Sequence, residues 1–193
     1  GASRPVTRPA YRRRMTDLLE RASALATLDD ALAAAAHAGR VVLLGGEAGV
    51  GKSSLVRALA ERHQRAARVL VGACDPLLTP RALGPLHDVA RDVGGDLAAL
   101  LAEGATRERV FAAVLDELDR PGPPTVLVVE DAHWADEATL DLLLFLARRV
   151  DRVRAVLLVT HRDDEVGPQH PHQSLLGRVP RDAVTRVHLD PLS

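Results

Sequence analysis

The chain has 193 residues, of which 47% are hydrophobic and only 2% aromatic, and its formal net charge is −1. This length suits one α/β domain with an aliphatic core, and the near-neutral charge excludes a strong overall field toward nucleic acid or an anionic membrane. Cys74 is the only cysteine, which excludes an intrachain disulfide. Since no apolar run reaches membrane-spanning length and no signal peptide is visible, we expect a reducing, cytoplasmic location.

The N-terminal residues divide into a leader and a first helix. Residues 1–14 contain two prolines and three consecutive arginines, and we expect them to form a flexible leader or tag remnant. We assign residues 15–193 to one core domain. A helix is expected over residues 16–38, because four leucines repeat at helical spacing on one face. Thr16 or Asp17 would cap its start and Gly39 would close it.

The rest of the chain alternates between strands and helices. We expect strands at residues 41–44, 69–72, 125–131 and 155–160, and an outer or edge strand at 184–189. We expect helices at residues 52–65, 81–93, 97–102, 106–119, 136–150 and 174–179. Such alternation predicts a three-layer α/β fold with a mainly parallel sheet of about five strands. Right-handed crossovers would place Gly46, Asp131 and Thr160, each at a strand end, on one edge of that sheet.

The segment GEAGVGKS, residues 46–53, matches the Walker A phosphate loop G-x-x-x-x-G-K-[ST] at every defined position. It follows an aliphatic strand and opens a helix, which is the context that a phosphate loop requires. Lys52, the only lysine of the chain, would bind the β- and γ-phosphates, and the Ser53 hydroxyl would ligate Mg²⁺. The predicted nucleotide-binding residues are Gly46, Glu47, Ala48, Gly49, Val50, Gly51, Lys52, Ser53 and Ser54.

The strand at residues 125–131 has the form of a Walker B strand, with four aliphatic residues followed by two acids. One acid at this edge would hold Mg²⁺, together with Ser53, and the other would polarise the attacking water. By position we assign Glu130 to magnesium and Asp131 to water activation. The usual pattern has aspartate first, so the reverse assignment stays open, and both acids are counted as candidate metal ligands.

Further candidate residues follow the Walker B strand and the next strand. Arg162 comes just after Thr160, where an arginine would stabilise charge on the phosphoryl oxygens. An equally good alternative is a surface ion pair between Arg162 and Asp163 or Asp164. Asp136 is expected to cap a helix, and Trp134 to pack rather than to act in catalysis. The two loop histidines at residues 170 and 172 lack a third ligand for a metal site.

The segments GEAGVGKSSL, VLVVEDAHWADEATLDLL and LLVTHRDDE resemble the ATPase module of the STAND branch of AAA-like P-loop NTPases. The subgroup they resemble most is the large ATP-binding LuxR-type transcriptional regulators. The segment Leu18-Leu19-Glu20-Arg21 resembles the family's adenine-side motif, so Arg21 is a candidate nucleotide-binding residue. Glu20 and Ala22 depart from that motif.

The resemblance implies an ATP/ADP-binding switch with Mg²⁺ as cofactor and slow hydrolysis of ATP. It places the effector and promoter DNA on other regions of a full-length regulator, with a helical lid expected to begin near residue 189. It also suggests that this chain alone is monomeric. Two other functions stay open from the sequence. A small-molecule or nucleotide kinase shares the Walker A loop, and a non-hydrolysing scaffold would bind nucleotide without using it.

Overall fold

The structure, a computed structural model, describes residues 8–77, 79–163 and 184–191. Its centre is a sheet of five parallel strands in the order β2-β3-β4-β1-β5. The strands are β1 (Arg40–Gly46), β2 (Arg68–Ala73), β3 (Thr125–Glu130), β4 (Ala155–Thr160) and β5 (Val184–Leu189). This sheet confirms the predicted fold class, and β5 occupies an edge as expected.

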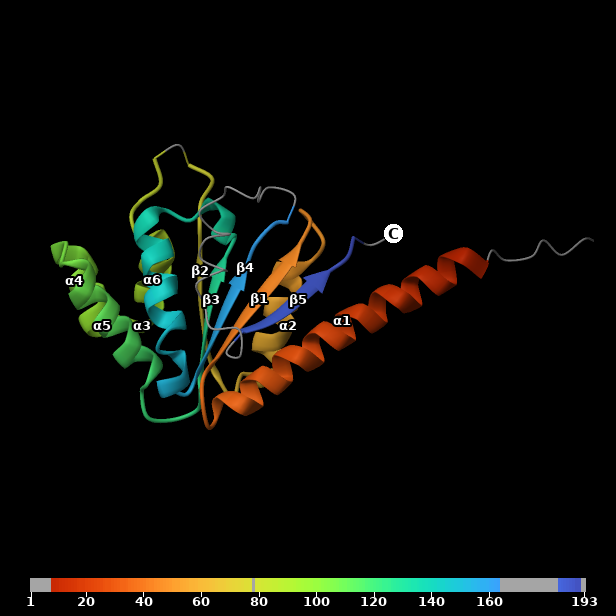
Figure 1. Cartoon of the computed structure of the whole chain (residues 1–193), viewed down its shortest axis with the longest axis horizontal. Helices are drawn as coiled ribbons and strands as arrows, with labels where there is room; N and C mark the ends of the chain where they lie inside the picture. The colour runs from red at the N-terminus through yellow and green to blue at the C-terminus, as the bar shows by residue number, and fades with distance from the viewer. Residues whose placement is uncertain (1–7, 78, 164–183, 192–193) are drawn as a thin grey trace, which may run out of the picture.

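Helices cover both faces of the sheet, giving three layers (Figure 1). The helices are α1 (Arg8–Ala35), α2 (Lys52–His63), α3 (Gly84–Val93), α4 (Gly95–Glu103), α5 (Arg107–Leu118) and α6 (Glu137–Ala147), with short 3-10 turns η1 (Ala132–Trp134) and η2 (Val150–Arg152). In Figure 1, α1 and α2 lie on one side of the sheet and α3 to α6 on the other. None of the described helices is both long enough and apolar enough to cross a membrane.

The strands bury both faces because their residues alternate between two separate apolar clusters. On β1, Val41 and Leu43 pack toward α3 to α6, whereas Val42 and Leu44 pack toward α1 and α2. The strands β3 and β4 divide in the same way, and their side chains are almost fully buried. Strands covered on both sides read as continuous aliphatic runs, which is why they could be recognised in the sequence.

The first helix differs from expectation. It begins at Arg8 rather than at residue 16, so the predicted cap at Thr16 or Asp17 is wrong. Pro9 does not prevent this start, because proline in a first helical turn removes no intrahelical hydrogen bond. The expected helix at residues 174–179 lies outside the described residues.

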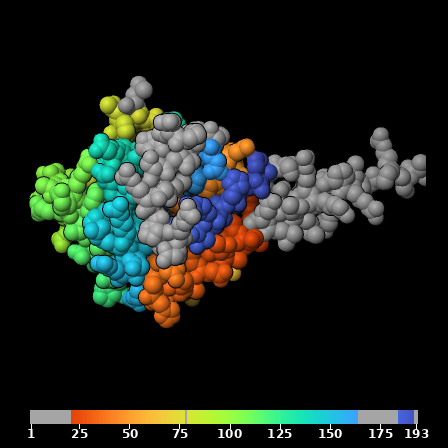
Figure 2. Space-filling model, in the orientation of Figure 1, coloured from red at the N-terminus to blue at the C-terminus, as the bar shows by residue number. Residues whose placement is uncertain are grey.

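The strand register brings the carboxyl ends of β1, β3 and β4 to one edge. Leu44 is paired with Thr160, and Val129 with Val159. The His161 N–H then donates to the Leu44 carbonyl at 3.0 Å, which continues the β4–β1 pairing past the end of β4. On the other side of β1, the edge strand β5 lies at the molecular surface next to α1 (Figure 2). This edge of the sheet holds the candidate site.

Candidate nucleotide-binding site

The phosphate loop connects β1 to α2 with three glycines at positive φ. Gly49 has φ 73° and Gly51 has φ 103°, values in the left-handed region that residues with a side chain rarely adopt. No other heavy atom lies within 4 Å of the position that a Cβ at Gly49 would take, so this backbone is open to a ligand. Successive N–H groups in such a loop, joined to a helix N-terminus, form a concave site for anions.

Lys52 lies inside this loop and is only 7% exposed. Its ammonium group donates to the Gly46 carbonyl at 2.7 Å and to the Glu47 carbonyl at 2.9 Å. These two bonds hold the charge next to the loop N–H groups, where phosphate oxygens would approach. Ser53 and Ser54 are exposed in the first turn of α2, so their hydroxyl groups are accessible from solvent.

Arg21 reaches the phosphate loop from α1. Its guanidinium donates to the Val50 carbonyl at 3.1 Å. A Cβ built on Gly51 would lie 2.8 Å from Nη2 of Arg21, so the close approach needs glycine there. A cavity of about 190 Å³ between α1 and α2 is lined by Arg21, Leu25, Gly51, Ser54 and Leu55, among other residues. The structure therefore places Arg21 beside the Walker A residues, although α1 lies far from them in sequence.

The two Walker B acids lie at the end of β3 and are both half-buried. Asp131 has φ 55°, an uncommon conformation for a residue with a side chain, and its N–H donates to Thr160 Oγ1 at 3.0 Å. The Glu130 Oε1 atom is buried and accepts no hydrogen bond from any described residue. A buried carboxylate oxygen without a partner is costly, so a hydrated cation at this atom would satisfy it. The donor set therefore fits Mg²⁺.

The turn after Asp131 was not foreseen from the sequence. Residues 132–134 form η1, and Trp134 is 40% exposed, so the expectation that it packs is wrong. Its ring centroid lies 5.3 Å from that of His133, which is buried. The predicted cap is confirmed, because Asp136 accepts a hydrogen bond from the Thr139 N–H at 3.1 Å. Asp136 also accepts one from the Leu83 N–H at 3.3 Å, a link that sequence spacing could not show.

The segment after β4 forms a cluster of histidine and aspartate side chains. Asp163 contacts His161 Nε2 at 3.0 Å and His188 Nδ1 at 2.9 Å, so one carboxylate joins β4 to β5. The pKa of His161 is lowered, chiefly by burial, which outweighs the opposing effect of Asp163; the positive charges of Lys52 and His188 act in the same direction as burial. Arg162, which follows His161 in the sequence, is half-buried. Asp164, its other expected partner, lies outside the described residues.

Two further expectations concern cysteine and metal chemistry. Cys74 follows β2 and is buried, and burial, with the negative charges of Asp136 and Asp131, raises the pKa of its thiol to about 12. It is therefore not a nucleophile at neutral pH. Within residues 8–77, 79–163 and 184–191, no three His, Cys, Asp or Glu side chains form a cluster that could hold a metal ion by themselves. The histidines at 170 and 172 fall outside these ranges.

Comparison with known sequences places this site in a family. Residues 17–159, which include the phosphate loop and both Walker B acids, match the family described as AAA ATPase domain. The chain belongs to the AAA ATPase domain family. It is also 30% identical, over 168 residues, to an uncharacterised protein of Rhizobium meliloti (strain 1021). That match covers 64% of this chain and only 16% of the relative.

Two solved structures share the fold. Cdc6p from Pyrobaculum aerophilum superimposes with a TM-score of 0.58 and 20% sequence identity, covering 86% of this chain and 45% of Cdc6p. A chain of the Drosophila ORC bound to DNA superimposes with a TM-score of 0.56 and 15% identity, covering 92% of this chain and 93% of the ORC chain. At these identities the similarity shows the P-loop NTPase fold alone. This chain thus spans less than half the length of Cdc6p.

Proposed function

We propose that this AAA ATPase domain binds Mg-ATP and works as a slow ATPase switch within a signal-responsive transcriptional regulator. The observation that carries the proposal is the meeting, at one sheet edge, of an intact phosphate loop and two acids, one of which has a buried oxygen that accepts no hydrogen bond from the described residues. Family membership supports nucleotide binding. The regulatory role rests on the resemblance of the Walker segments and the DAHWAD sequence to LuxR-type regulators.

The phosphate loop would bind the nucleotide through its N–H groups and Lys52. The Lys52 ammonium already lies in the loop, bonded to the carbonyl oxygens of Gly46 and Glu47. On binding, it exchanges neutral carbonyl acceptors for charged phosphate oxygens, which accept stronger hydrogen bonds. Arg21 adds a second positive charge from α1 and, by its bond to the Val50 carbonyl, steadies the loop. We place the adenine base of the nucleotide in the neighbouring cavity between α1 and α2.

Magnesium would be held by Ser53 and by Glu130, whose buried Oε1 atom has no hydrogen-bond donor in the part of the chain that the structure describes. The ion would supply charge neutralisation at the phosphates. Asp131 would orient and polarise the attacking water, because its backbone is held by Thr160 on the neighbouring strand. Arg162, two residues beyond β4, would stabilise charge on the transferred phosphoryl group.

The effector and promoter DNA would bind to other parts of the regulator. The Drosophila ORC structures were solved with DNA, but the net charge of −1 of this chain gives no basis for binding DNA by itself. ATP would shift the population of domain arrangements toward the one that it binds more tightly, and this shift would connect the ATPase domain to the effector- and DNA-binding parts.

Phosphate release from Mg-ATP tests the catalytic assignment. We expect slow turnover by the wild-type chain, with Asp131→Asn retaining ATP binding and losing turnover. Glu130→Gln should weaken Mg²⁺-dependent binding instead. Arg57→Ala, at an exposed position on α2, is the matched control and should behave as wild type. If Glu130→Gln abolishes turnover while keeping binding, the roles of the two acids are reversed.

A further inference from the structure

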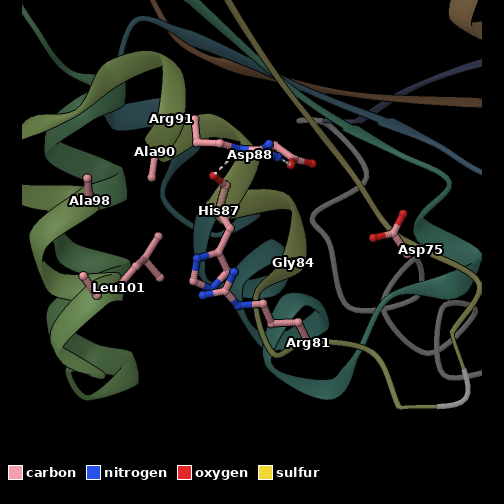
Figure 3. A pocket seen from close by; sticks show the side chains of 10 residues that line it. Asp75, Arg81, Gly84, His87, Asp88, Ala90, Arg91, Ala98 and Leu101 are labelled. Carbon is pink, nitrogen blue, oxygen red and sulfur yellow. Dashed lines mark hydrogen bonds and ion pairs between the residues drawn. The ribbon is translucent and has the colours of Figure 1, made fainter.

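A second cavity, of about 600 Å³, lies between α3 and α4 at the β2 side of the domain (Figure 3). It shares no lining residue with the phosphate loop. Since β2 is three strand positions from β1 in the sheet, its strand axis is about 14 Å from the one that carries the loop. The volume falls in the range typical of sites for small organic molecules. The cavity is therefore separate from the nucleotide site, and its ligand must be inferred from its own lining residues.

The polar side of the cavity carries one positive charge that no carboxylate of the described residues pairs with. Arg91 forms an ion pair with Asp88, and the other Asp88 oxygen accepts a hydrogen bond from the Ala73 N–H at 3.1 Å. Arg81 forms no ion pair with any residue that the structure describes. In Figure 3 its guanidinium lies beside the His87 ring, while Asp75 stands apart from both.

His87 is the second polar group at this point. The pKa of its imidazole is lowered by burial and by the charge of Arg81, with Arg91 contributing in the same direction and Asp88 opposing. The ring is therefore neutral at neutral pH, and its single N–H is engaged by the Ala82 backbone. Arg81 supplies the donors and the positive charge at this end of the cavity, with the uncharged His87 ring beside it.

The opposite wall, on α4, is apolar. It is formed by Ala98, Leu101 and Ala102, with Ala90 of α3 beside them. Gly84, at the start of α3, also lines the cavity, and a Cβ built there would meet no heavy atom within 4 Å. One end of the cavity thus suits an anionic head group and the other a short apolar body.

We propose that the cavity between α3 and α4 binds a small amphipathic carboxylate, with its head group at Arg81 and His87 and its apolar body against α4. The Arg81 guanidinium, which has no ion-pair partner among the described residues, selects an anion, and its fork geometry matches a carboxylate. Apolar contacts with Leu101 and the neighbouring alanines select a ligand with a hydrocarbon body. This site would let the ATPase domain itself sense a metabolite.

Two hydrogen bonds connect neighbours of the cavity residues to the end of β3 and the turn after it, one at the Walker B acid Glu130 and one at Asp136. The Cys74 N–H, one residue before Asp75 of the cavity, donates to the Glu130 carbonyl at 2.9 Å. The Leu83 N–H, directly before Gly84, donates to Asp136 Oδ1 at 3.3 Å. Leu83 has φ 57°, a strained conformation for a bulky residue, and such strain favours a segment with two arrangements. A ligand at α3 would bias this segment and, through it, the end of β3.

The test is a titration of the 193-residue chain with hexanoate, monitored by the chemical shifts of the backbone amides. The comparators are 1-hexanol, which lacks the carboxylate, and acetate, which lacks the longer hydrocarbon body. Titration up to about 20 mM detects dissociation constants in the millimolar range. We expect hexanoate to bind more tightly than either comparator and to shift amides of α3 and α4. Arg81→Gln should weaken hexanoate binding about tenfold. Gly84→Leu should abolish it by filling the cavity. Arg65→Gln, an exposed arginine outside the cavity, is the matched control and should bind as wild type.

Unchanged affinity in either cavity variant, or no shift of the wild-type amides, would overturn the site. The coupling rests on the proposed nucleotide site and is measured separately. Saturating hexanoate should change the dissociation constant of Mg-ATP at least about threefold, and ATP should change that of hexanoate by the same factor. If hexanoate binds but neither dissociation constant changes in the presence of the other ligand, the link to the Walker B acids is refuted. If ATP fails to bind while hexanoate binds, the failure lies with the proposed nucleotide function.

Discussion

The backbone N–H of Asp131 donates a hydrogen bond of 3.0 Å to the side-chain hydroxyl of Thr160. Thr160 is 1% exposed and ends β4, the strand between the Walker B strand and the strand of the phosphate loop. Asp131 has a left-handed backbone, so its orientation depends on such a partner. Thr160 is therefore a positioning residue for the acid that we assign to water activation.

Replacing Thr160 by valine removes this acceptor while keeping the side-chain shape. The Asp131 N–H then loses its partner, and we expect the free energy of unfolding to fall by about 1–3 kcal/mol. Urea unfolding measures the change. Thr160→Ser, which keeps the hydroxyl oxygen, is the control and should preserve any ATP turnover that Thr160→Val loses. Equal turnover in the two variants would show that the bond does not position Asp131.

The packing of β2 against α3 predicts unequal effects at two glycines. A Cβ on Gly72 would lie 2.1 Å from the Pro85 carbonyl oxygen, which is backbone and cannot move aside cheaply. Gly72→Ala should therefore destabilise the fold by about 2 kcal/mol or more. Gly84→Ala meets no heavy atom beyond its chain neighbours, but a Cβ before Pro85 disfavours the helical backbone, which offsets the lower entropy of the unfolded chain; the free energy of unfolding should change by less than about 1 kcal/mol. Similar midpoints for both variants in denaturant would contradict this packing.

Stability should depend on pH through His161. Its folded pKa lies below the usual 6.5, mainly because burial disfavours the charged ring. Between the folded pKa and about 6.5 the unfolded state binds more protons, so stability falls as the pH is lowered through this window. The groups that face the ring are Asp163, Lys52 and His188. His161→Gln should flatten the profile below about pH 6.5, leaving the slope that comes from His87, whose pKa is also lowered.

A steeper profile in His161→Gln than in the wild-type chain would contradict the burial of a neutral His161. Thermal unfolding at a series of pH values measures the slope. His63→Gln is a suitable comparison, because it removes a histidine that pairs with Asp29 on the opposite side of the sheet.

The thiol of Cys74 should be unreactive in the folded chain. It is 6% exposed, and its pKa of about 12 leaves almost no thiolate at pH 8. We expect a disulfide exchange reagent to label it orders of magnitude more slowly than in urea-unfolded chain, since labelling requires opening of the structure. Rapid labelling of the native chain would show that the end of β2 opens readily.

Much of this fold could be predicted because its strands are buried on both faces. The limits of β4 and β5 agree with expectation residue for residue, and the other strands agree within a few residues. Short continuous aliphatic runs between glycines, prolines and charged residues leave little ambiguity. The start of α1 was missed, because prolines and arginines near the N-terminus resemble a leader more than a helix.

The residues of the candidate site could also be predicted only where a local sequence pattern marks them. The phosphate loop and the Walker B acids carry local sequence patterns, so their residues could be named in advance. The contacts of Asp163 with His161 and His188, and of Asp136 with Leu83, join segments far apart in the chain. No spacing rule covers such pairs, because they depend on strand order and on the turn at η1. The cavity between α3 and α4 depends on the packing of two helices, so it could not be predicted from the sequence either.

The most direct test of the central claim is the thermal unfolding of the chain with and without Mg-ATP. At about one hundred times its dissociation constant, the ligand should stabilise the fold by roughly 2.7 kcal/mol. For a domain of this size that is a rise in Tm of about 5–10 °C. We predict this rise for the wild-type chain and for Arg57→Ala, and its loss in Lys52→Ala. No rise at millimolar Mg-ATP, or an equal rise in Lys52→Ala, would contradict a nucleotide site at this phosphate loop.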